Sequence, residues 1–114
     1  MSSSALIALK NRFVALSGAV SGIIPSINSS SSHVNAVINS LNENYNYDDM
    51  IADLNFNEKN KSEIDEISST LSNSVLPAID DKIAELERLI QEALAREAAE
   101  EAAREAERNS GFNF

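Results

Sequence analysis

Residues 6–41 read LIALKNRFVALSGAVSGIIPSINSSSSHVNAVINSL, and the spacing of the apolar side chains in this stretch decides the fold. Apolar residues recur at alternating steps of three and four, and Ser30 is the one polar residue in the series. This register is typical of a helix that buries one narrow seam against other helices. We therefore predict a helix over about residues 4–42. We expect its seam to bind helices of a protein partner, and the seam consists of Leu6, Leu9, Phe13, Leu16, Val20, Ile23, Ile27, Val34, Val37 and Leu41.

Pro25 lies inside this pattern, and a serine run at residues 29–32 follows it. A proline removes one backbone hydrogen bond and crowds the preceding turn, at a cost of about 3 kcal/mol in a regular helix. The helix therefore either kinks near Pro25 or breaks and restarts with Ser32 as its N-cap. The register is preserved beyond the proline, which favours the kink.

A second helix is expected over about residues 62–108, after an Asn-rich and acidic link at residues 43–61. Steps of four between Ile67 and Ile83 interrupt its heptads, and this stutter straddles Pro77. Beyond Leu94 the sequence is rich in Ala, Glu and Arg, which predicts a solvated helical extension. The apolar seam of the second helix is Ile64, Ile67, Leu71, Val75, Ile79, Ile83, Leu86, Ile90 and either Ala93 or Leu94.

Together these patterns predict an all-α protein, a two-helix antiparallel hairpin in which each helix is kinked at a proline. We expect one domain over residues 1–108 and a flexible tail over residues 109–114. The scarcity of Gly (3) and Pro (2) argues against a turn-rich β fold.

The charge balance excludes several classes of partner. The chain has 9 Lys and Arg against 18 Asp and Glu, for a net charge of −9. Nucleic-acid binding needs clustered basic side chains, and none are clustered here.

Lys10 and Arg12 before the apolar stretch 13–24 could belong to a secretory signal, but small and polar residues interrupt that stretch. We also judge the stretch too short to span a membrane, and expect no stable membrane insertion.

The first helix carries no charged residue from Phe13 to Asn42. Its other faces hold Ser, Ala, Gly and Asn, and Gly18-x-x-x-Gly22 would let a neighbouring helix approach closely. One interpretation is that this outer face meets a protein partner. The alternative is a soluble Ser/Asn-rich surface without a partner.

No residue pattern points to chemistry. His33 is the one histidine, and it has no predictable Asp or Cys partner. Metal-ligand spacings and phosphate-binding glycine loops are absent from the sequence, so we expect no enzyme activity, no metal and no cofactor. Phe112 and Phe114 follow the helix-ending Gly111 and are either a short recognition peptide or a disordered end.

The chain is acidic and consists of two long helices, the first of which is rich in Ser and Ala. The second helix contains the segment Ile79-Asp80-Asp81-Lys82-Ile83-Ala84-Glu85-Leu86-Glu87. In these features the chain resembles the WXG100-like proteins of type VII secretion. More particularly, it resembles the small helical partners of LXG toxins. The resemblance implies a chaperone-like adaptor, cytoplasmic or exported with its partner, that pairs with toxin N-terminal helices or with a second small helical protein. A self-associating coiled-coil structural protein of a phage or cell envelope is the alternative, and a homo-oligomer is compatible with either.

Overall fold

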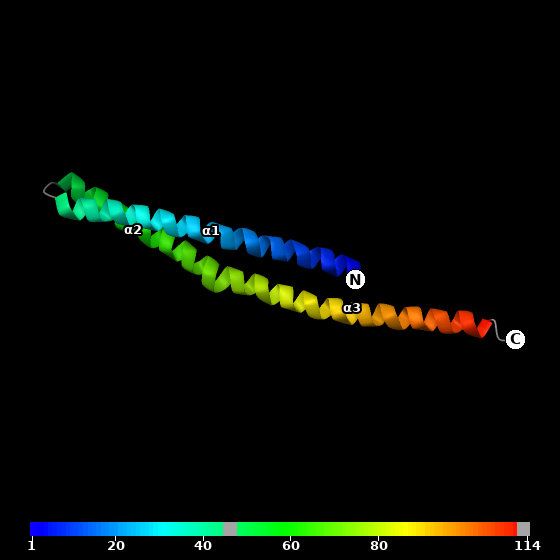
Figure 1. Cartoon of the computed structure of the whole chain (residues 1–114). Coiled ribbons are helices and arrows are strands. Elements are labelled where there is room, and N and C mark those ends of the chain that lie inside the picture. The colour runs from blue at the N-terminus through cyan, green and yellow to red at the C-terminus, as the bar shows by residue number, and fades with distance from the viewer. Residues whose placement is uncertain (45–47, 112–114) are drawn as a thin grey trace. The chain divides into compact units, whose positions relative to one another are not determined.

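A computed structural model describes the backbone of residues 1–44 and 48–111, and the side chains of residues 1–43 and 51–111. The described chain consists of α1 (Ser3–Asn44), α2 (Asp48–Thr70), the π-helical segment η1 (Leu71–Val75) and α3 (Leu76–Gly111) (Figure 1). The all-α class and the antiparallel hairpin are therefore confirmed.

The packing divides the chain into two compact units, each of which is described by itself. Unit 1 combines Met1–Ala15 with Asp80–Phe114, and unit 2 is Leu16–Ile79. The expectation of a single domain stays a prediction. In both units the paired residue numbers run in opposite directions. Asn28 and Ser31 bond to Ser68 and Asp65 in unit 2, for example, which establishes the antiparallel pairing.

Unit 1 has the better-formed core. Its buried residues are Leu6 from α1 and Leu86, Ile90 and Ala93 from α3; Leu9, Phe13 and Leu89 pack against them. The Lys10 ammonium lies 3.3 Å from a Glu87 carboxylate oxygen beside this cluster. Beyond Glu97, every described residue of α3 is exposed, which confirms the solvated extension.

The N-terminus of α1 forms hydrogen bonds both to Ser2, which precedes it, and to a carboxylate of α3. The Ala5 N–H donates to Ser2 Oγ at 3.2 Å, as expected for a serine cap. The Ser3 N–H donates to Glu97 Oε1 at 3.0 Å, and the Ser3 hydroxyl donates to Glu97 Oε2. These two bonds to Ser3, the hydroxyl bond foremost, lower the pKa of Glu97. A carboxylate from α3 thus satisfies one free N–H group, that of Ser3, at the positive end of α1.

α1 continues through Pro25 without a break. The Ser32 hydroxyl donates to the Asn28 carbonyl at 3.2 Å, the bond of a residue within a helix, so the restart at Ser32 is wrong. Because Pro25 has no N–H, one carbonyl group of the preceding turn loses its hydrogen-bond donor. Pro25 is exposed, so water can reach this carbonyl group. The kink at Pro25 stays a prediction.

Pro77 is accommodated differently, by the π-helical turn before it. The Leu76 N–H donates to the carbonyl oxygen of Leu71, five residues back. This turn holds one residue more than an α-helical turn, and it places Pro77 in the first turn of α3, where no N–H is needed. The stutter from Ile67 to Ile83 in the sequence corresponds to this extra residue.

The expected link at residues 43–61 is wrong, because α2 already begins at Asp48. Asn disfavours a helix by less than about 0.7 kcal/mol per residue relative to Ala, which favourable contacts can outweigh. Two acidic residues open α2 and complement the positive end of its dipole. The Asn57 amide donates to the Asp53 carbonyl at 2.8 Å within the helix. α3 also extends to Gly111, three residues beyond the predicted helix end.

Candidate interaction surface

Every seventh residue of α1 faces its partner helix, as the sequence predicts. Leu6 and Val20 are buried on this line, and the others are half-buried. The line consists of Leu6, Phe13, Val20, Ile27, Val34 and Leu41. It is the half of the predicted seam that the hairpin itself uses.

The other half of the predicted seam is largely uncovered. Leu9 packs against the unit 1 core, but Leu16, Ile23 and Val37 are 48%, 50% and 46% exposed. The hairpin instead covers the other side of the line that begins at Leu6, where Ser17, Ile24, Ser31 and Ile38 are turned inward. One partner helix can cover only one flank of so wide a stripe. The predicted seam therefore turns outward along this row.

Two further apolar side chains of unit 2 lie on the same side. Ser31, on the covered flank of α1, bonds to Asp65. Ile67 follows Asp65 by two residues and so lies about 200° around α2, on the side of the uncovered row. Phe56 is eleven residues before Ile67, close to three full turns, and shares its face. Ile67 is 53% exposed and Phe56 69% exposed.

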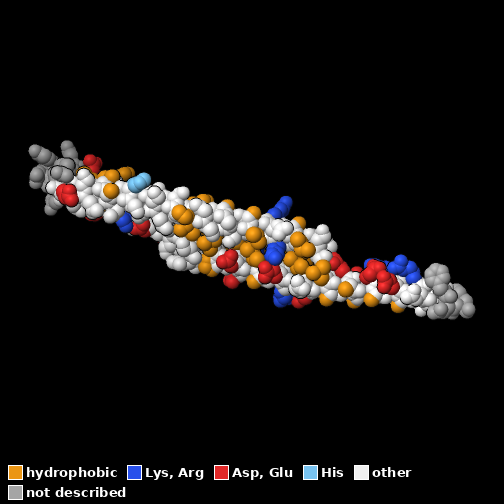
Figure 2. All heavy atoms as spheres, viewed as in Figure 1, with side chains coloured by type: hydrophobic (Ala, Val, Ile, Leu, Met, Phe, Trp, Pro, Cys, Tyr) orange, Lys and Arg blue, Asp and Glu red, His pale blue; other side chains and the backbone are white. Residues whose placement is uncertain are grey.

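We call Leu16, Ile23, Val37, Phe56 and Ile67 the uncovered face of unit 2. Sequence reasoning placed Ile67 in the inward seam and Phe56 in the link, so it missed both as surface residues. Their spacing of eleven, three helical turns, was the signal that could have joined them. Figure 2 shows hydrophobic side chains that reach the surface over the middle of the face in view, among polar and charged ones.

An open groove lies on α2 at this face. It is lined by Glu63, Glu66, Ile67, Thr70 and Leu71. Among the described residues, no Lys or Arg comes within ion-pair distance of either glutamate of the groove. The groove thus combines an apolar floor with two glutamates that form no ion pair among the described residues.

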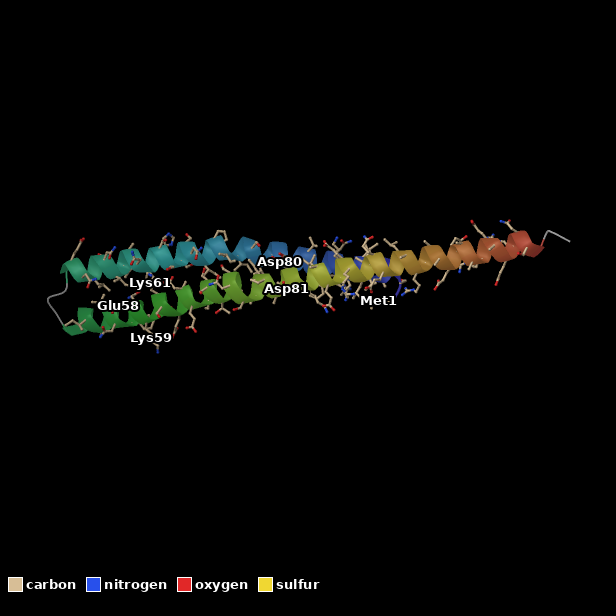
Figure 3. All side chains as sticks on the ribbon, turned by 90° about the horizontal axis from the view of Figure 1, so that it is seen from below. Met1, Glu58, Lys59, Lys61, Asp80 and Asp81 are labelled. Atoms are coloured by element: carbon tan, nitrogen blue, oxygen red, sulfur yellow. The ribbon has the colours of Figure 1, made fainter. Side chains whose placement is uncertain are left out.

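On the opposite flank of unit 2, polar side chains of α1 and α2 bond to one another. The Ser68 hydroxyl donates to the Asn28 side-chain oxygen at 2.7 Å, and Ser31 donates to Asp65. Lys61 lies 2.7 Å from the same Asp65 carboxylate, and these two bonds to Lys61 and Ser31 lower the pKa of Asp65. Figure 3 shows Lys61 on the side of α2 toward α1, and Lys59 projecting away from α1.

The remaining predicted site residues do not join this face. Gly18 and Gly22 lie on the outer side of α1, where a Cβ would meet nothing within 4 Å. No other helix of the described chain therefore comes close to these two glycines, and their role toward a partner stays a prediction. Phe112 and Phe114 lie outside the described residues.

The described residues show no assembled reactive site. His33 is exposed. The hydroxyls of Ser30 and Ser32 donate to backbone carbonyls four residues back, and Ser31 donates to Asp65. No group of three or more metal-ligating side chains occurs in the described part of the chain.

The length argument against a membrane span is wrong. The helical stretch Ser3–Glu43 is long and apolar enough to cross a membrane by length and composition, with a mean hydropathy of 1.3 in its best window. The helix reaches this length because α1 continues through Pro25. The apolar residues beyond the serine and glycine positions therefore belong to the same helix. A core helix or a signal sequence passes the same test, so the expectation of no stable insertion stays a prediction.

No protein-family model matches the sequence, and no curated protein or solved structure is similar enough to count as a match.

Proposed function

We propose that this protein is a non-enzymatic, chaperone-like adaptor whose helices pack with those of a larger secreted partner, in the manner of the small proteins associated with LXG toxins in type VII secretion. The observation that carries the proposal is the row of Leu16, Ile23 and Val37, apolar and exposed on a helix that has no charge from Phe13 to Asn42. A helix in contact only with water normally carries charged residues on its exposed side.

The antiparallel hairpin supports this proposal, because it is the architecture that the resemblance implies. The chain has no Trp and hence no Trp-x-Gly turn, so the assignment rests on architecture and surface. Burial of the uncovered face against partner helices would remove apolar area from water, at roughly 25 cal/mol for each Å².

The test is to purify the protein from its native source and measure the mass of the complex, and to co-express it with the products of neighbouring genes. We expect a stable complex of fixed stoichiometry. Leu16→Glu should abolish pairing, because it would bury an unpaired charge. Val14→Glu is the matched control, since Val14 is equally exposed, at 47% against 48%, but lies about 200° away around α1. A monodisperse protein that ignores all those products would refute the adaptor.

Self-association as a coiled-coil structural protein is the second candidate. The absence of charge from Phe13 to Asn42 favours it, because two copies of α1 could meet along this segment without like-charge repulsion. Light scattering on the pure chain separates the two functions. A discrete homo-oligomer that persists on dilution supports the structural protein, and a monomer supports the adaptor.

A further inference from the structure

The antiparallel helix pair of unit 2 leaves apolar side chains exposed along one of its sides. The uncovered face draws Leu16, Ile23 and Val37 from α1 and Phe56 and Ile67 from α2, on one side of an antiparallel pair. A third helix that lies along two neighbouring helices packs its own apolar stripe into the groove between them. Leu16 and Val37 are about 31 Å apart along α1, so a helix of roughly 20 residues would cover the row.

The charges on the two helices of this face are asymmetric. On α1 no residue from Phe13 to Asn42 is charged, whereas α2 carries Glu63 and Glu66 beside Ile67 without an ion-pair partner among the described residues. α2 as a whole has seven acidic residues and two lysines. One of these, Lys61, is paired with Asp65, and the other, Lys59, projects away from α1 (Figure 3).

We propose that the uncovered face of unit 2 binds an amphipathic helix of a different protein, one that carries apolar residues at steps of three and four and Lys or Arg along the flank that meets Glu63 and Glu66. The inference rests on the proposed function, and it specifies the surface and the chemistry of the partner. Cations on that flank would compensate two charges that the chain leaves unpaired.

The same charges argue against a second copy of this chain as the occupant. The uncharged segment of α1 from Phe13 to Asn42 in a second copy would bring no cation to Glu63 and Glu66, and its α2 would bring seven further acidic residues against two lysines, one of them already paired with Asp65. Like charges that face one another across an interface disfavour the contact. A heterologous basic helix satisfies the face, and a second copy of unit 2 does not.

The test uses single-cysteine variants of the full chain, which has no cysteine of its own. Ile67→Cys places an environment-sensitive fluorophore on the uncovered face. Ile51→Cys is the matched control, because Ile51 is also an exposed isoleucine of α2 but lies about 160° around the helix from Ile67. The probes are two designed helical peptides with the same Leu heptads, one with Lys and one with Glu on its flank.

We expect the Lys peptide to shift the emission of the label at position 67 to the blue, with little change at position 51, and the Glu peptide to bind about tenfold more weakly or worse. The double variant Glu63→Gln/Glu66→Gln should weaken binding of the Lys peptide several-fold and reduce its dependence on salt. Circular dichroism of each variant verifies that helicity is retained.

Four outcomes would overturn the inference. They are equal binding of both peptides, equal shifts at both label positions, no binding of either peptide, and a blue shift at position 67 that depends on protein concentration without peptide. The last outcome would identify a second copy as the occupant. The proposed function can survive any of them, because a native complex could form through another surface, and its mass measurement reports that separately.

Discussion

Leu86→Ala tests which face of α3 forms the core of unit 1. Leu86 is 2% exposed and contacts the cluster of Leu6, Ile90 and Ala93. The change removes about three methyl and methylene groups at roughly 0.8 kcal/mol each, or about 2.4 kcal/mol. The remaining cavity adds little, because the flanking residues of the cluster are only partly buried and can close in. We therefore expect a loss of about 2–3 kcal/mol in the free energy of unfolding.

The matched control is Leu94→Ala, the same substitution eight residues later on α3. Leu94 is 43% exposed and lies outside the core cluster, so we expect a loss of about 0.5 kcal/mol. Urea denaturation followed by circular dichroism measures both values, if the slopes with denaturant agree. Equal losses, or a larger loss for Leu94→Ala, would refute the reasoning, because they would mean that α3 is rotated from the face described.

Three further predictions concern the termini, the prolines and the membrane. The folded-state pKa of Glu97 lies below its ordinary value near 4.5, so its stabilising effect is present above the unfolded-state pKa and is lost as the pH falls through the folded value. The free energy of unfolding should thus fall less steeply with decreasing pH in Glu97→Gln than in the wild type. Parallel curves would contradict the role of Glu97 at the N-terminus of α1. Pro25→Ala should raise stability in urea by about 1–3 kcal/mol, because it restores a hydrogen bond in a continuous helix, and Pro77→Ala should raise it by less, since η1 already accommodates that ring. In flotation with anionic vesicles the chain should remain unbound because its net charge is −9, and co-flotation would show that α1 enters the bilayer.

Much of the fold could be predicted from local patterns. The recurrence of apolar residues at steps of three and four identified α1, and the stutter at Pro77 marked the place of η1. The Asn-rich segment misled the prediction because Asn is a weak helix former and not a helix breaker, so its tertiary context decides. Leu54, half-buried in the segment predicted as a link, illustrates that context.

The candidate surface was predictable only in part. Leu16, Ile23 and Val37 were identified as residues for a partner, but the same reasoning gave that role to Leu6 and Val20, which the hairpin buries. A partner contact at any of these positions stays a prediction. Ile67 and Phe56 could be assigned to the exposed side only once the bond between Ser31 and Asp65 fixed how α2 is turned.

By itself, the sequence determined that the chain is helical, where its apolar stripes run and that α1 carries no charge from Phe13 to Asn42, because these properties depend on residues near one another in one segment. Only the tertiary structure decided which flank of each stripe is covered. It placed Ala93 and not Leu94 in the core of unit 1, and it left Ile23 outside the hairpin of unit 2. The physical reason is that periodicity defines a stripe wider than one neighbouring helix can bury, so the choice of flank depends on contacts between segments far apart in the chain.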